Sequence, residues 1–272
     1  MLLPETDAMP RGIAKREFEV RFVDVGHGNA TILRWPSGEV WLIDAGSAAG
    51  DRSAVERIDG VLADLGARRI DRLWLSHPDR DHYGAAIGLA ERFPIGVVHV
   101  PAAHRANPDS RWRQTLAALE TRGIPIEPVE RGDRIEPRGS TRRPDGASVL
   151  YPPRIAPPGL DDNGTSLVLL IEAGGGRLLL PGDLEGEAAP AVRSEVGSVD
   201  LLVAPHHGSP GSDPLGWIER TRPFLVVVSG SKRHPWMDAV DPRREEGTET
   251  IRNGLRTGGI DPKWRRNGRS PR

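Results

Sequence analysis

The sequence Ser76-His77-Pro78-Asp79-Arg80-Asp81-His82 follows the short apolar run Arg72–Leu75, which predicts a buried strand. It places four potential metal ligands within six residues of one loop. Side chains two positions apart in an extended turn can point the same way, so His77 and Asp79 can bind one metal. Asp81 and His82 begin the next predicted helix and can bind a second. In the alternative interpretation, Asp81 only caps this helix by accepting hydrogen bonds from free backbone N–H groups.

Other apolar strands in the sequence also end at histidine or aspartate. The residues at these ends are Asp24, Asp44, Asp183, His206, His207 and, one loop further on, His234. Segments with helical spacing, such as Arg52–Gly66, lie between several of the strands, which is the pattern of an α/β fold. Loops at strand ends converge in such folds, so we expect these side chains to form one site.

The composition excludes several classes of protein. The 272 residues contain no cysteine, which rules out disulfide scaffolds, zinc fingers and thiol nucleophiles. Lys and Arg number 37 against 38 Asp and Glu, so the net charge of −1 excludes a globally basic nucleic-acid-binding surface. No apolar run reaches the roughly 20 residues of a membrane span, and residues 1–16 lack a signal-peptide pattern. We therefore expect a cytoplasmic protein without a membrane partner, of unspecified oligomeric state.

Six motifs occur in order between residues 18 and 236. They are Asp24-Val25-Gly26-His27-Gly28-Asn29-Ala30, Leu42-Ile43-Asp44-Ala45-Gly46, His77-Pro78-Asp79-Arg80-Asp81-His82-Tyr83-Gly84, Asn163-Gly164-Thr165-Ser166-Leu167, Leu180-Pro181-Gly182-Asp183-Leu184-Glu185 and Pro205-His206-His207-Gly208-Ser209. Together they resemble the metallo-β-lactamase fold hydrolases, and within these the ComEC-like branch related to the hydrolase domain of competence DNA-uptake proteins. The resemblance implies an α/β fold, the αββα sandwich, in which two mixed β-sheets pack face to face with helices on both outer faces.

The resemblance also divides the chain into three parts. We expect residues 1–16 to be a flexible lead-in, residues 17–237 to be the hydrolase domain that carries the motifs, and residues 238–272 to be a basic C-terminal segment. This last segment has few apolar residues, and we expect it to be disordered apart from a helix near residues 248–256. Two interpretations of it remain open, a tail that attracts a polyanion and a solvated tail without a partner.

Carried over residue by residue, the motifs imply two metal positions. His77 and Asp79 bind the first metal, Asp81 and His82 the second, Asp183 bridges both, and His207 completes the second position with His206 as the competing choice. The chain departs from the wider family at Asp79 and Asn163, where imidazoles are usual. Oxygen donors in their place favour Mn²⁺ or Mg²⁺ relative to Zn²⁺ and weaken the first position. The expected cofactors are two divalent ions, Zn²⁺ or Mn²⁺.

The implied reaction is hydrolysis by a hydroxide that two metals activate. A phosphodiesterase, and specifically a nuclease acting on DNA or RNA, is the favoured activity, with Asp81 and Asp183 at the reacting centre. His234 is the candidate acid that protonates the leaving oxygen, because ComEC-like proteins have a His-Pro pair in this region. His27 lies between two glycines and can approach the metals or the substrate. A loop residue without a role is the alternative for both histidines.

Further polar residues are assigned supporting roles. The candidates for binding a substrate phosphate are Asn163, Thr165, Ser166, Lys232 and Arg233. Asp44 is expected to orient a metal-bound histidine by accepting a hydrogen bond from it. His99 and His104 belong to no motif and are interpreted as structural or surface residues.

Two other functions remain open at this stage. The first is a small-molecule hydrolase of the same fold that acts on an ester, lactam or thioester, which would require a deep closed pocket. The second is a weakly active binding module in a defence or competence assembly. This binding module remains an alternative because Asp79 and Asn163 stand where the wider family usually has imidazoles.

Overall fold

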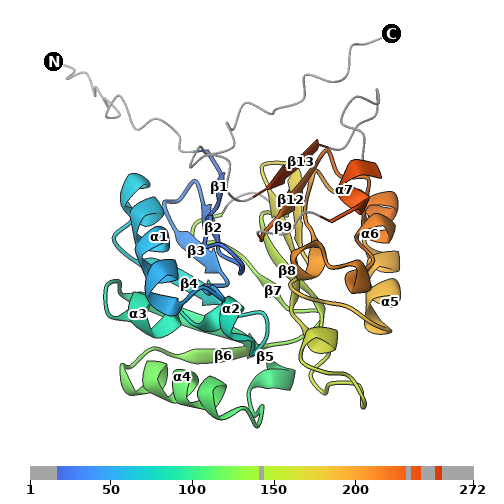
Figure 1. The fold of residues 1–272 in the computed structure, drawn as a ribbon. Coiled ribbons are helices and arrows are strands. Elements are labelled where there is room, and N and C mark those ends of the chain that lie inside the picture. The colour runs from blue at the N-terminus through green and yellow to red at the C-terminus, as the bar shows by residue number, and fades with distance from the viewer. Residues whose placement is uncertain (1–16, 141–143, 231–233, 240–248, 253–272) are drawn as a thin grey trace, which may run out of the picture.

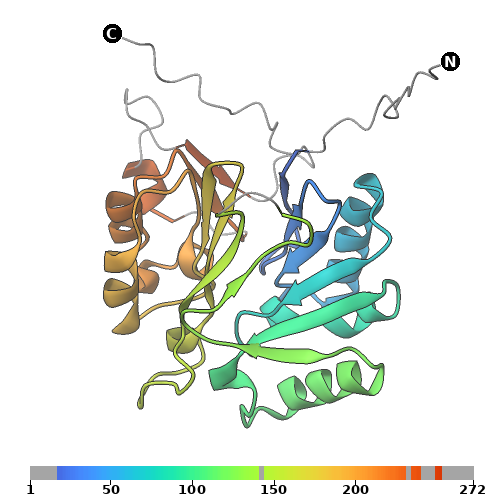
Figure 2. The same cartoon turned by 180° about the vertical axis from the view of Figure 1, so that it is seen from behind.

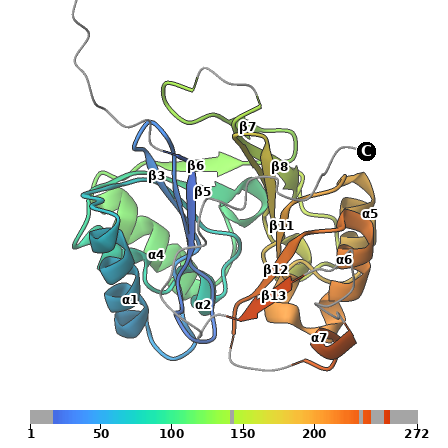
Figure 3. The same cartoon turned by 90° about the horizontal axis from the view of Figure 1, so that it is seen from above.

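The fold is a sandwich of two β-sheets with helices on both outer faces (Figure 1). It is described by a computed structural model that covers residues 17–140, 144–230, 234–239 and 249–252. The view from above shows the two sheets in the middle, α1, α2 and α4 outside one of them, and α5, α6 and α7 outside the other (Figure 3). The predicted αββα sandwich is therefore confirmed.

The first sheet contains six strands in the order of the sequence. They are β1 (Glu19–Phe22), β2 (Thr31–Arg34), β3 (Val40–Ile43), β4 (Ile70–Trp74), β5 (Ile95–Pro101) and β6 (Ile126–Val129). The first three strands are antiparallel, and β3 to β6 run parallel. Its helices are α1 (Asp51–Asp64), α2 (Arg80–Tyr83), α3 (Ala86–Ala90) and α4 (Ser110–Thr121), with the 3₁₀ turn η1 (Ala102–His104) after β5.

The second sheet has the strand order β13-β12-β11-β10-β9-β8-β7. Its strands are β7 (Arg134–Ile135), β8 (Gly146–Tyr151), β9 (Val168–Ala173), β10 (Gly176–Leu180), β11 (Leu201–Val203), β12 (Leu225–Val228) and β13 (Glu249–Arg252). The helical segments are α5 (Ala188–Glu195), α6 (Pro214–Thr221) and α7 (Trp236–Ala239), with 3₁₀ turns η2 (Asn163–Thr165), η3 (Pro205–Gly208) and η4 (Pro210–Ser212). Seen from behind, the chain crosses from the first half of the molecule into the second between β6 and β7 (Figure 2).

Alternation along the strands explains why the sheets pack together. In β3, Trp41 and Ile43 belong to the core between the sheets, whereas Leu42 packs with the helices outside the first sheet. Successive side chains of a strand point to opposite faces, so a strand that is apolar at every position must be covered on both. Helices α5 and α6 complete the arrangement with a third core outside the second sheet.

The C-terminal part differs from the sequence-based expectation. Glu249–Arg252 forms a strand, β13, which pairs in parallel with β12 at the edge of the second sheet. The predicted helix near residues 248–256 is therefore wrong at these four positions, because pairing with an existing sheet edge overrides local helical spacing. The remaining residues of that segment, and those of the lead-in 1–16, lie outside the described residues. Among the described residues, no helix has the length and apolarity needed to cross a bilayer.

Shortening a buried side chain in the core outside the first sheet should lower the free energy of unfolding without altering the strand-end loops. Leu62 of α1 is fully buried in that core. We expect Leu62→Ala to lower the free energy of unfolding by about 2–5 kcal/mol, because it removes buried apolar surface and leaves a cavity. Urea unfolding measures the change. Asp64→Ala, at an exposed position two residues on, should stay within about 0.5 kcal/mol of wild type, and equal losses in both variants would contradict this account.

Candidate metal centre

Loops from both sheets meet at one edge of the sandwich and are joined there by backbone hydrogen bonds. The Leu167 N–H donates to the Ser76 carbonyl at 3.0 Å and so links the loop after β4 to the start of β9. The Asn29 N–H donates to the Asp81 carbonyl at 3.1 Å, which links the loops after β1 and β4. The motif residues singled out by the sequence therefore come together, although they are far apart along the chain.

A first group of side chains, cluster A, consists of His77, His82 and Asp183. Their ligand atoms all lie within 4.8 Å of one another, and all three residues are buried. His82 Nε2 is 3.1 Å from Asp183 Oδ1, and His77 Nε2 is 4.0 Å from Asp183 Oδ2. Asp79 extends this cluster toward solvent, with Oδ2 3.5 Å from His77 Nε2.

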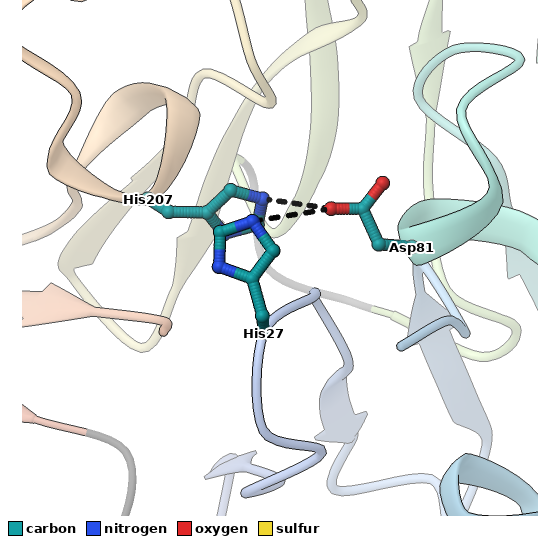
Figure 4. Close-up of side chains that lie close together, drawn as sticks. All are labelled: His27, Asp81 and His207. Atoms are coloured by element: carbon teal, nitrogen blue, oxygen red, sulfur yellow. Dashed lines mark ion pairs between the residues drawn. The ribbon is translucent and has the colours of Figure 1, made fainter. Parts of the chain in front are cut away.

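A second group, cluster B, consists of His27, Asp81 and His207 (Figure 4). Asp81 Oδ2 lies 3.3 Å from His207 Nε2 and 3.8 Å from His27 Nε2. The His27 and His207 rings are close, with centroids 4.5 Å apart. His27 thus lies among the potential metal ligands.

The two clusters are adjacent. His207 Nε2 is 3.4 Å from Asp183 Oδ2 and 3.4 Å from His82 Nε2. The sequence grouped His82 with Asp81, whereas the geometry groups His82 with His77 and Asp183 and keeps it next to His207. Asp183 lies between the imidazoles of both clusters.

Hydrogen bonds at Nδ1 fix the orientation of the buried histidines. His82 Nδ1 donates to Asp44 Oδ2 at 2.8 Å, and His207 Nδ1 donates to the Ser229 carbonyl at 3.0 Å. Ser76 Oγ donates its proton to Asp44 and therefore accepts from His77 Nδ1 at 2.9 Å. Because Nδ1 is the donor in all three rings, the lone pair of each neutral imidazole is on Nε2, which faces the centre of the site.

Burial and ion pairing shift the pKa values of the buried side chains in opposite directions. Burial alone would raise the pKa of Asp183, but the charges of His82 and His207 hold it well below its ordinary value. Burial also opposes ionisation of Asp81, yet the hydrogen bond from His207 and the charge of His82 lower its pKa to about 2. Burial favours neutral His82, but Asp183 and Asp44 raise its pKa well above the ordinary value. The carboxylates therefore require positive charge beside them.

Two glycines allow the loops to approach so closely. A Cβ atom on Gly46 would lie 2.3 Å from the Asp81 carbonyl carbon and 2.5 Å from the His82 nitrogen. A Cβ atom on Gly28 would lie 2.4 Å from the Gly46 carbonyl oxygen, and the φ angle of Gly28 is +150°. Only glycine fits at these positions, which explains why both motifs carry it beside the functional residue.

The remaining predicted residues lie around the clusters or outside the described part. His206 Nε2 lies 3.8 Å from Asp183 Oδ2. Ser166 Oγ accepts from the Asp183 N–H at 3.0 Å, and Thr165 and Asn163 lie in η2, just before Ser166. His234 lies against Gly208, where a Cβ atom would be 3.3 Å from its ring. Lys232 and Arg233 lie outside the described residues.

His104 supports the site although it belongs to no motif. It is buried in η1, and its Nε2 donates to the Thr165 carbonyl at 3.1 Å, which fixes the turn that carries Asn163. Burial and the neighbouring charge of His77 lower the pKa of His104 to about 4. No spacing rule connects residues so far apart, so the sequence offered no signal for this contact.

The donor set fits divalent cations. His77 Nε2 and Asn163 Oδ1 are buried and make no hydrogen bond within the described part of the chain. Buried lone pairs without a partner are costly, and a cation would satisfy them. Imidazole nitrogen combined with carboxylate oxygen suits Zn²⁺ and Mn²⁺.

Comparison with known proteins settles the family. The family model of the metallo-beta-lactamase superfamily matches residues 23–213. The chain belongs to the metallo-beta-lactamase superfamily. ComE operon protein 3 of Bacillus subtilis (strain 168) is 30% identical over 234 residues, which are 80% of this chain and 29% of that protein. Competence protein ComA of Neisseria gonorrhoeae is 26% identical over 266 residues, which are 92% of this chain and 31% of that protein.

These relatives agree with the ComEC-like branch that the motifs indicated. The chain spans less than a third of the length of either. Among solved structures, a mutant of the CmlA beta-hydroxylase has a TM-score of 0.55 at 20% identity, over 87% of this chain and 52% of that chain. At this identity the likeness shows the metallo-beta-lactamase fold alone. Membership of the superfamily supports a metal-dependent hydrolase and leaves its substrate open.

A side chain at position 46 should disrupt the site. We expect Gly46→Ala to lower the free energy of unfolding by about 1–3 kcal/mol and to weaken metal binding, because the added carbon overlaps the Asp81 and His82 backbone. Urea unfolding and calorimetric metal titration measure the two effects. Gly60→Ala is the matched control, since nothing lies within 4 Å of its Cβ position in α1 and it should leave metal binding unchanged. Tight metal binding by Gly46→Ala would show that the loops can separate without harm.

His104 should make the metal-free protein sensitive to acid. Its pKa is about 4 in the folded protein against 6.5 ordinarily, so the unfolded chain binds the proton first as the pH falls. This contribution to stability is complete above pH 6.5 and is lost as the pH falls toward 4, by at most about 1.4 kcal/mol per pH unit. In EDTA, His104→Gln should therefore have a shallower loss of unfolding free energy between pH 6.5 and 4. Identical slopes for the two proteins would refute the assignment.

Proposed function

We propose that this chain is a dinuclear metal-dependent phosphodiesterase that cleaves DNA or RNA. The observation that carries the proposal is the set of buried imidazoles whose Nε2 atoms converge on Asp183 while their Nδ1 atoms are bound elsewhere. A purely structural histidine cluster has no need of this uniform orientation. Metal-binding histidines have it because an acceptor at the other nitrogen fixes the ring and makes it a better donor.

The ligands are assigned to two positions. His77, Asp79 and Asp183 would hold one cation, and Asp81, His207 and Asp183 would hold the other, with His27 close to the latter. His82 lies between the two positions. It would also reach the second cation, because its Nε2 is 3.4 Å from His207 Nε2. Two divalent cations supply Lewis acidity and an activated water for attack at phosphorus.

The negative charge of the carboxylates around the site explains why cations would be required for substrate binding as well as for hydrolysis. Asp44, Asp79, Asp81 and Asp183 surround the site and repel a phosphodiester. Divalent ions reverse the sign of this field where the phosphate must lie. The metal-free protein should therefore bind nucleic acid poorly.

Other residues of the chain position and move protons. Asp44 holds His82 through the 2.8 Å hydrogen bond at Nδ1. His234, beside Gly208, is assigned as the acid for the leaving oxygen, and Lys232 and Arg233 as phosphate-binding residues. The names of the relatives support a nucleic-acid substrate, since one of them is a competence protein.

Loss of the central carboxylate should abolish cleavage. Labelled single- and double-stranded DNA and RNA are incubated with the protein in Mn²⁺, Zn²⁺ or Mg²⁺. We expect cleavage by wild type that EDTA stops, and a fall of at least about 100-fold in Asp183→Ala, since even loss of a residue that supports a ligand costs about 10–100-fold.

Asp64→Ala, an exposed aspartate on α1, is the matched control and should cut like wild type. Absence of cleavage on every substrate with every metal would refute the phosphodiesterase. Equal cleavage by Asp183→Ala would trace the activity to a contaminant and refute it equally.

A further inference from the structure

The motif resemblance implies that Asn163 stands where related hydrolases usually have an imidazole, and in this structure its amide is held in one orientation. Asn163 Nδ2 donates to Glu185 Oε1 at 3.4 Å. The carboxylate of Glu185 accepts only, so the amide nitrogen faces Glu185 and the amide oxygen faces away from it. That oxygen, Oδ1, is buried and makes no hydrogen bond among the described residues.

The second oxygen of the same carboxylate orients His206. His206 Nδ1 donates to Glu185 Oε2 at 2.7 Å, which leaves the lone pair on Nε2, 3.8 Å from Asp183 Oδ2. The backbone of His206 is left-handed, with φ 46° and ψ 53°, and its N–H donates to the Gly182 carbonyl at 3.0 Å. A non-glycine residue keeps such a conformation only where its surroundings fix it.

His206 and His207 consequently do not compete for one position. His207 is bound through Nδ1 to Ser229 and faces Asp81, whereas His206 is bound to Glu185 and approaches Asp183 Oδ2, the oxygen that also faces His77. Both imidazoles approach Asp183 Oδ2, His207 at 3.4 Å and His206 at 3.8 Å, but separate partners fix the two rings and only His207 also faces Asp81.

We propose that Glu185 is a positioning residue that completes the first metal position through Asn163 and His206. Its two oxygens aim Asn163 Oδ1 and His206 Nε2 at the cation held by His77, Asp79 and Asp183. The inference rests on the proposed metal-dependent function. It explains how a position that lacks the usual imidazole keeps enough donors.

Glu185→Ala tests this through metal binding, independently of catalysis. The protein is stripped with EDTA and titrated with Mn²⁺ and with Zn²⁺ by calorimetry, and bound metal is counted after dialysis. Wild type should bind two ions per chain. Glu185→Ala should bind one ion with wild-type affinity and the other about 10–100-fold more weakly. This is the usual cost of removing a residue that orients a metal ligand.

The matched control is Glu187→Ala, two residues further on, because Glu187 is exposed and makes no side-chain capping bond to α5. It should bind both ions as wild type does. Asn163→Ala should weaken the same ion as Glu185→Ala, and the double variant should lose less than the sum of the two, because Glu185 acts partly through Asn163. Circular dichroism in EDTA checks that each variant is folded, and Asn163→Ala provides the test if Glu185→Ala is not.

The outcomes separate the two proposals. The role of Glu185 would be overturned if folded Glu185→Ala bound both ions with wild-type affinity. It would also be overturned if the losses of metal affinity in Glu185→Ala and Asn163→Ala added fully in the double variant. Either result would leave the proposed metal centre intact. A wild-type protein that binds no ion would overturn the proposed function itself.

Discussion

The site depends on one buried carboxylate, Asp183, at the junction of the two sheets. Its Oδ1 faces His82, and its Oδ2 is approached by the Nε2 atoms of His77, His206 and His207. A buried carboxylate without positive charge beside it costs several kcal/mol. The imidazoles come from the loop after β4 in the first sheet and the loop after β11 in the second. The need to satisfy Asp183 therefore joins the halves of the sandwich at the edge where the two clusters lie.

Protons and cations are alternative partners for this carboxylate. Without a cation, Asp183 and Asp44 raise the pKa of His82, so the proton on His82 supplies the missing charge. That stabilisation is present below the ordinary value of 6.5 and is lost as the pH rises through the higher pKa of the folded protein. A bound cation replaces the proton, so metal affinity rises with pH over the same interval. Cation binding at this site would therefore also stabilise the folded state.

The sequence predicted the fold, and its short local patterns indicated which side chains the structure brings together at one edge. Helical segments between apolar strands indicated an α/β fold, the ordered motifs implied the sandwich through their resemblance, and the polar residues after the strands indicated which loops converge. Contacts between loops were not predictable in this way. His104 reaches Thr165 across 61 residues, and Glu185 reaches Asn163 across 22, so no spacing rule records either contact. Strand β13 was missed because its pairing with β12, rather than its own composition, makes it a strand.

Backbone strain is concentrated where the chain positions its ligands. Five non-glycine residues of the described part have positive φ angles, and three of them are Asp44, His206 and His207. Such conformations cost about 1–3 kcal/mol each and persist only where the surroundings fix them. Here Ser76 holds Asp44, Glu185 holds His206 and Ser229 holds His207. The sandwich core offsets that cost, and in return the imidazoles keep a fixed geometry before any cation arrives.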